Sequence, residues 1–183
     1  MAPQQWQLDQ SDGHLTIRTG VEGPAAKMGH RLDIAMNIWE ATVGWSDGEP
    51  AQVNVTVETD SLVVLGGEGG VTPLTGPEKA LARSNAVKVL GAKQFPQITF
   101  QSDDIERTGT GCRLTGRVQI HGTVRDCVVE LRVEELDDAW RLSADVDVRQ
   151  SDFGVKPYSM MMGAMKVADT VTVSFSAERS RDN

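Results

Sequence analysis

The side chains able to do chemistry are few in this sequence of 183 residues, and their spacing matches no catalytic or metal-binding pattern. The three histidines, His14, His30 and His121, are scattered, and no His or Cys has the spacing of metal ligands. We therefore expect a structural or surface role for each histidine. The sequence predicts no metal site and no cofactor.

The remaining candidate motifs for catalysis or phosphate binding are also incomplete. Cys112 and Cys127 have no obvious base beside them, and no GxSxG sequence is present. Residues 66–70 (GGEGG) superficially resemble a phosphate-binding loop but match neither GxGxxG nor GxxxxGK[ST], so a flexible turn is expected. Two acidic pairs are typical of turns rather than of hydrolase carboxylates: Asp103-Asp104 and Asp137-Asp138. We predict that the protein is not an enzyme.

Composition narrows the classes of partner. A net charge of −8 and a pI near 4.9 argue against nucleic acid and disfavour docking on an anionic membrane surface. The N-terminal residues show no secretory signal, and no run approaches the ~20 apolar residues that span a bilayer. These features predict a soluble, cytoplasmic protein with no membrane insertion. In that compartment two buried thiols are expected rather than a disulfide.

Alternation of apolar and polar residues with a period of two is the dominant pattern, and it places one face of each segment on a core. About eight such segments occur, near residues 15–17, 32–38, 53–57, 98–100, 114–120, 127–133, 140–149 and 171–177. The links between them are mostly short and polar, which favours neighbouring antiparallel hairpins. Such a sheet must bury its apolar face against itself, as a closed barrel or a sandwich. We expect one all-β domain over residues 1–183.

Two segments do not follow this alternation of apolar and polar residues. Residues 77–91 are rich in Ala, Lys, Leu and Val and end at Gly91, which predicts one short helical segment across an end of the sheet. Residues 156–165 contain Tyr158 and four methionines. Because thioether chains are adaptable, these methionines suit a mouth or lid that meets hydrophobic chains; a loop packed on the core or in a dimer contact is the alternative.

The barrel interior also has two interpretations. A barrel of about eight strands is just wide enough to be filled by side chains or to hold one slender ligand. The inward residues are mainly Val, Leu, Ile and Ala, and Gly116 is expected to leave space among them. On pattern alone, a filled core is somewhat favoured over a cavity.

Several segments resemble the YceI-like family of lipocalin-like barrels. They are WQLD at 6–9, KQFPQITFQS at 93–102, LTGRVQIHGTVR at 114–125, RQSDFGV at 149–155 and VADTVTV at 167–173. The resemblance implies an antiparallel up-and-down barrel with an internal channel for a long apolar molecule. Family members are associated with polyisoprenoids, isoprenoid quinones and fatty ligands, and many form dimers.

The resemblance and the inward pattern together predict a non-enzymatic carrier whose ligand lies in the barrel interior. Tyr158 and the methionines are expected near the entrance. The predicted ligand-binding residues are Phe95, Ile98, Phe100, Val118, Ile120, Val129, Leu131, Val146, Val148, Phe153, Tyr158, Met161 and Phe175. A homodimer is a further expectation.

Some of the matched positions also have structural interpretations. Phe95-Pro96 is expected to shape a helix-to-strand corner, and His121-Gly122 a hairpin turn. Arg149 is expected to pair with Asp152. The alternative function is a filled barrel, stress-related or regulatory, that acts through a dimer or a surface partner. An enzyme acting on a lipid-like substrate would have to use His121 or Tyr158.

Overall fold

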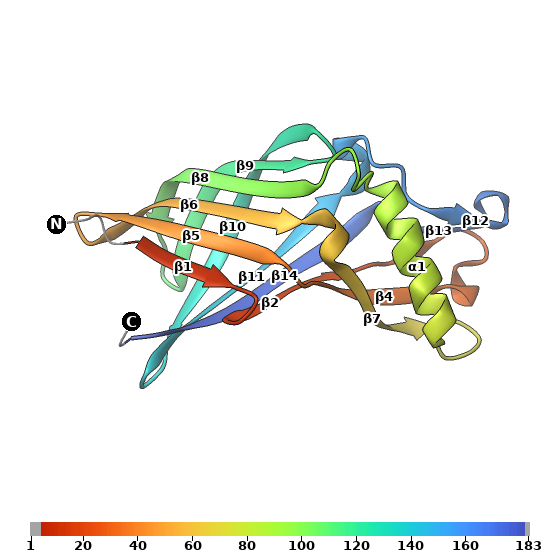
Figure 1. Cartoon of the computed structure of the whole chain (residues 1–183), viewed down its shortest axis with the longest axis horizontal. Helices are drawn as coiled ribbons and strands as arrows, with labels where there is room; N and C mark the ends of the chain where they lie inside the picture. The colour runs from red at the N-terminus through yellow and green to blue at the C-terminus, as the bar shows by residue number, and fades with distance from the viewer. Residues whose placement is uncertain (1–4, 182–183) are drawn as a thin grey trace.

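The computed structural model describes residues 5–181, and most of them belong to one strongly curled antiparallel sheet (Figure 1). Its strands, in spatial order, are β1 (Gln5–Asp9), β5 (Trp39–Ser46), β6 (Glu49–Glu58), β8 (Gln97–Arg107), β9 (Gly111–Ile120), β10 (Thr123–Glu135), β11 (Ala139–Arg149), β14 (Thr170–Ser180), β2 (Gly13–Arg18), β4 (His30–Met36) and β7 (Leu62–Gly69). The strands β8 to β11 follow one another both along the chain and across the sheet, so this part is an up-and-down meander, whereas β7 and α1 intervene in the chain between the paired strands β6 and β8.

Smaller elements gather at one end of the curled sheet. A second sheet consists of β3 (Val21–Glu22), β13 (Met165–Val167) and β12 (Ser159–Met160). The helix α1 (Gly76–Val89) crosses the same end (Figure 1). Four short 3-10 turns complete the described elements: η1 (Ala26–Met28), η2 (Thr59–Ser61), η3 (Gln150–Phe153) and η4 (Met161–Gly163).

The expected number of about eight strands is not confirmed, because the main sheet has eleven strands within residues 5–181. The eight expected segments correspond to β2, β4, β6, β8, β9, β10, β11 and β14, and the strands that were not expected are β1, β5 and β7. Two of these follow a bend: β5 is separated from β4 by only two residues, and β7 is separated from β6 by η2. Ser61 stabilises the first bend, since the Ile38 amide donates to its hydroxyl at 3.1 Å and the Asn37 amide to its carbonyl at 3.2 Å.

The curled sheet also differs from the expected closed ring of paired strands. Its two end strands are β1 and β7, which pair with β5 and β4 and, within residues 5–181, not with each other. Because β4 and β5 follow one another through the bend at residues 37–38, the chain itself joins the two ends of the curl. The result is a half-barrel whose strands surround one interior.

The glycine-rich run at residues 66–70 is not the flexible turn that its composition predicted. Gly66, Gly67 and Gly69 continue β7 and pair with β4. Gly67 sits tightly there, because a Cβ atom would lie 3.1 Å from the Arg31 carbonyl oxygen. Glycine in this strand therefore permits close approach of the neighbouring backbone.

The helix expected at residues 77–91 is confirmed as α1. Thr75 caps its N-terminus: the Glu78 amide donates to the Thr75 hydroxyl at 3.3 Å, and the Thr75 amide donates to the Glu78 carboxylate at 2.8 Å. Pro77 occupies the first turn, where its missing N–H costs nothing. Ala82, Ala86 and Val87 pack the helix against the core of the sheet.

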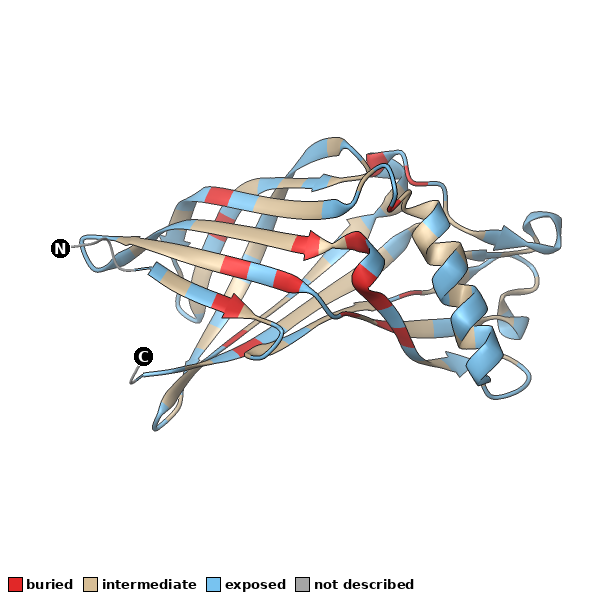
Figure 2. Ribbon diagram, viewed as in Figure 1, coloured by how far each residue is buried: buried red, intermediate tan, exposed pale blue. Residues whose placement is uncertain are grey.

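Burial is uneven along the inner face of the sheet (Figure 2). A compact core surrounds the bends, where Met36, Trp39 and Leu62 are each at most 3% exposed. On β9, β10, β11 and β14, inward residues such as Val118 and Val146 alternate with exposed ones yet are only half-buried. Inward side chains that stay half-buried indicate a hollow interior, because a packed core would cover them.

Candidate ligand-binding cavity

An elongated cavity of about 730 Å³ occupies the interior of the curled sheet. Its wall comes from the inward positions of the strands, including Ile98 on β8, Val118 on β9, Val129 on β10 and Val146 on β11. Aliphatic side chains dominate this wall. The volume lies within the ~300–1,000 Å³ that is usual for small-molecule sites. The interior is therefore not filled by its own side chains.

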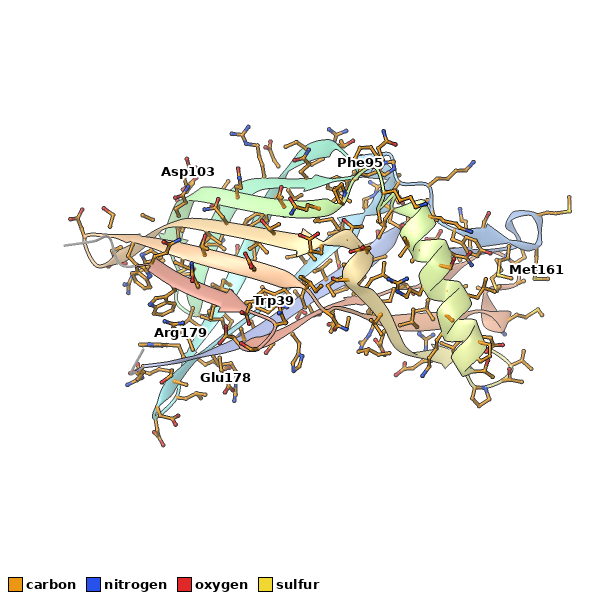
Figure 3. All side chains as sticks on the ribbon, in the orientation of Figure 1. Trp39, Phe95, Asp103, Met161, Glu178 and Arg179 are labelled. Carbon is orange, nitrogen blue, oxygen red and sulfur yellow. The ribbon has the colours of Figure 1, made fainter. Side chains whose placement is uncertain are left out.

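The end of the barrel opposite α1 is occupied by aromatic residues that lie beyond the cavity lining. The rings of Trp6 and Trp45 contact each other with centroids 4.9 Å apart. The guanidinium of Arg179, labelled in Figure 3, lies over Trp6 at 5.7 Å from the ring centroid, a cation–π arrangement. This cluster thus lies at the end of the half-barrel remote from the helix and outside the cavity lining.

Polar side chains of the cavity are concentrated at the α1 end, which we call the mouth. His30, Glu78, Asn85, Tyr158 and Lys166 all line it there. Several already have partners: the His30 imidazole lies 2.7 Å from the Thr72 carbonyl oxygen, and Lys166 lies 3.8 Å from Glu22. The bond from the Thr75 amide lowers the pKa of Glu78 below its ordinary value.

Asn85 and Tyr158 differ from these neighbours. Neither side chain hydrogen-bonds another residue within the described part of the chain, although both line the mouth. A carboxamide and a phenol offer both donors and acceptors. The mouth therefore has two polar side chains available to the polar end of a bound molecule.

All but two of the predicted ligand-binding residues line the cavity. They are Ile98, Phe100, Val118, Ile120, Val129, Leu131, Val146, Val148, Phe153, Tyr158 and Phe175. Contact between these side chains and a ligand stays a prediction. Phe95 and Met161 lie outside the lining, and both are corrections to the predicted set.

Phe95 lies over the turn that joins β9 to β10, away from the interior (Figure 3). Its ring packs against His121 with centroids 4.6 Å apart. His121 and Gly122 both have positive φ, at 53° and 72°, so they shape the hairpin turn as expected. A Cβ on Gly122 would lie 2.6 Å from the Phe95 ring, which explains the glycine. His121 is consequently not positioned to act on a molecule in the cavity.

Met161 projects from the tip of the loop between β12 and β13 (Figure 3). Met160 and Met165, which flank that tip, do line the cavity. They face each other in the β12–β13 pair, and the residues between them form the turn. The methionine segment is thus divided between the mouth and the exposed tip.

Two further expectations are corrected by the contacts. Arg149 pairs with Asp169 at 3.7 Å, not with Asp152. Bonds from the hydroxyl and amide of Ser151 lower the pKa of Asp169. Gly116 does not leave space for a ligand, because a Cβ there would lie 2.2 Å from the Gln101 carbonyl oxygen. The backbone of β8 occupies that room.

The predicted ligand-binding set leaves out the part of the wall that comes from the first half of the chain, although period-two alternation already places one face of segments 15–17, 32–38 and 53–57 on the core. These residues include Leu8, Leu15, Ile17, Leu32, Ile34, Met36, Val43, Val53, Val55, Ala82 and Asn85. A usable signal was present in β5, where Trp39, Ala41 and Val43 alternate with Glu40 and Thr42.

The two thiols are free and half-buried. Burial raises the pKa of both Cys112 and Cys127. Cys127 lines the cavity, whereas Cys112 lies outside the lining. Across residues 5–181, no three His, Cys, Asp or Glu side chains are grouped as a metal ion would need. No helix in the described chain is both long and apolar enough to cross a bilayer.

Within residues 5–181, a curled antiparallel sheet surrounds an apolar cavity and the helix α1 crosses its mouth, which defines the class as an antiparallel β half-barrel. A family model described as the YceI-like domain matches residues 6–179, so the chain belongs to the YceI-like family. This confirms the resemblance seen in the sequence motifs. A sequence comparison with curated proteins gives no significant match.

Solved structures support the same fold. BcnA of Burkholderia cenocepacia is similar with a TM-score of 0.70 and 18% identity, over 94% of this chain and 99% of that one. The YceI protein of Campylobacter jejuni is similar with a TM-score of 0.61 and 15% identity, over 82% of this chain and 85% of that one. At these identities the likeness establishes the fold alone.

Proposed function

We propose that the protein binds a long apolar molecule, an isoprenoid or fatty chain, inside the cavity and carries it without changing it chemically. The observation that carries this proposal is the apolar cavity of about 730 Å³. Burying a hydrocarbon chain there would contribute ~0.8 kcal/mol for each CH₂ group. Membership of a family that the sequence resemblance associates with such ligands supports the same proposal.

The ligand's orientation follows from the distribution of polar groups. The tail lies along Val118, Val129 and Val146, because that stretch of wall offers no charge. The polar end lies at the mouth, where Asn85 and Tyr158 are available for hydrogen bonds. An isoprenoid quinone or a fatty acid has this division between a long tail and a small polar end.

The alternative function, a filled barrel that acts through a dimer or a surface partner, requires an interior filled by side chains, and the cavity speaks against it. A carrier needs no catalytic group, and His121 lies against Phe95 outside the cavity, so we propose no reaction. The homodimer and the cytoplasmic location remain predictions.

Native mass spectrometry of freshly purified protein tests the proposal, followed by organic extraction and mass analysis of the extract. We expect a hydrophobic adduct in stoichiometric amount, or an apo protein that takes up added isoprenoids or fatty chains. An apo protein that binds neither class of added chain would refute the carrier function.

A further inference from the structure

Exposed apolar side chains surround the cavity mouth. Met28 in η1 is 52% exposed, Val71 in the β7–α1 link 78%, and Leu81 in α1 60%. Met161 and Met162 at the β12–β13 tip are 52% and 106% exposed. Four separate segments of the chain therefore present apolar groups to solvent at one end of the molecule (Figures 1 and 2). We call these five residues the apolar rim.

The two methionines at the tip are held outward by an unusual backbone. Met161 and Met162 have φ values of 54° and 56°, in the left-handed region that unbranched non-glycine residues seldom adopt. Two consecutive residues in this region are costly, and such strain is concentrated at functional segments. A loop that needed only to turn would more readily place glycine there, as it does at Gly163.

Lysines accompany the apolar rim. Lys27 precedes Met28, Lys79 lies two residues before Leu81, and Lys156 and Lys166 flank the methionine tip. Within the described residues only Lys166 has a carboxylate within ion-pairing distance, that of Glu22. The segments 21–29, 70–82 and 155–167 together contain these four lysines and only two acids, Glu22 and Glu78.

This local charge contrasts with the net charge of −8 for the whole chain. Acidic groups such as Asp103 lie toward the opposite end of the half-barrel (Figure 3). Because salt screens charges beyond ~8 Å at physiological ionic strength, groups at the far end contribute little to an encounter at the mouth. The net charge of the whole chain, which disfavours an anionic surface, therefore does not apply to the mouth end, where the apolar rim lies.

We propose that the mouth end docks on a lipid bilayer that carries anionic headgroups. The apolar rim enters the interfacial layer, and the flanking lysines meet the headgroup phosphates, a combination typical of peripheral binding. The rim is continuous with the cavity, because Met28, Val71 and Leu81 also line it. Docking thus opens the cavity toward the acyl chains, and an apolar ligand can transfer without crossing water. The transfer, but not the docking, rests on the proposed carrier function.

Vesicle flotation of the full chain tests the docking. We expect the protein to float with phosphatidylcholine vesicles that contain phosphatidylglycerol, and to float less with pure phosphatidylcholine or at high salt. The double variant Met161→Ser, Met162→Ser should weaken partitioning about tenfold or more. A matched control is Val124→Ser, Val128→Ser, which removes two exposed valines on the outer face of β10 and should float as the parent does.

Two lysine variants test the contribution of charge to docking. Lys27→Gln and Lys156→Gln should each weaken partitioning about fivefold, the effect of roughly one lysine near an anionic surface. Arg117→Gln and Arg132→Gln remove exposed charges on β9 and β10 and should leave flotation unchanged. Flotation that is absent in the parent protein, or equal in the rim variants and the controls, would overturn the proposal. So would a dimer that the methionine substitutions dissociate without any flotation of the parent.

A second readout separates docking from carriage. Binding of a fluorescent polyene fatty acid, measured without vesicles, should be retained by every rim and lysine variant. Loss of flotation with retained probe binding supports the docking surface. A parent protein that floats but binds neither this probe nor an isoprenoid would refute the carrier function and leave the docking surface standing.

Discussion

The ring of Phe175 stands edge-on to the indole of Trp39, with ring centroids 5.4 Å apart and an interplanar angle of 79°. Trp39 begins β5 just after the bend and is fully buried, at 1% exposure. Phe175 comes from β14, which is not a neighbour of β5 in the sheet, and it also lines the cavity. The contact therefore joins β5 to β14, and Trp39 packs against the Phe175 ring, which lines the cavity.

Replacing Trp39 and Phe175 by alanine should lower the free energy of unfolding by different amounts. Trp39→Ala should lower the free energy of unfolding by about 3–5 kcal/mol, because it empties a fully packed site. Phe175→Ala should cost less than half as much, because one side of its ring already faces the hollow. Urea denaturation of both variants measures the difference. Equal costs would show that Phe175 is packed on all sides and that the cavity does not reach it.

The thiols provide a probe of cavity occupancy. In a Cys112→Ser variant, alkylation of Cys127 by iodoacetamide should slow about tenfold or more when a fatty chain is bound, because Cys127 lines the cavity. In the Cys127→Ser variant, alkylation of Cys112 should be unaffected by the ligand. Burial raises the pKa of both thiols, so the alkylation rate of each should keep increasing as the pH rises above about 8.5, the ordinary pKa of a cysteine.

Mass spectrometry of the alkylated protein over time gives both rates. Equal protection of the two thiols would indicate a general tightening of the structure rather than a ligand in the cavity. An absence of protection at Cys127 under saturating ligand would place the ligand elsewhere.

The helix cap predicts a pH dependence. The pKa of Glu78 is lowered in the folded state by the bond from the Thr75 amide. Its contribution to stability is therefore complete above the unfolded glutamate value of about 4.3 and is lost as the pH falls through the lower folded value. Parent protein should be more stable than Glu78→Gln at neutral pH, and the gap should narrow below pH ~4. Thermal unfolding across this range measures the gap; a gap independent of pH would contradict the cap.

Much of the wall was predictable because β-strand alternation is a local property. Period two alone places Val118, Val129 and Val146 on the inner face, and all three line the cavity. The short helix was also predictable, since Thr75, Pro77 and Glu78 form a local start signal. These features depend only on neighbours along the chain.

The failures involve contacts between distant residues. Phe95 turns outward because His121 and Gly122, on a different hairpin, receive its ring. Gly116 is needed by the backbone of β8 rather than by a ligand. The strand count missed the short β1 and also β5 and β7, which follow the bends at residues 37–38 and 59–61, where no proline or glycine marks a boundary. The alternation of apolar and polar residues along the chain gives no information about such contacts between distant segments.

The cavity as the binding site is tested most directly by filling it. Val129 lines the cavity, while its neighbour Val128 faces outward and is 52% exposed. We would titrate Val129→Trp and Val128→Trp with a fluorescent fatty acid and with an isoprenoid competitor. We expect Val129→Trp to fold normally and to lose at least about tenfold in affinity, because the indole occupies the ligand's volume, while Val128→Trp should bind as the parent does. Equal affinity in the two folded variants would contradict binding inside the cavity.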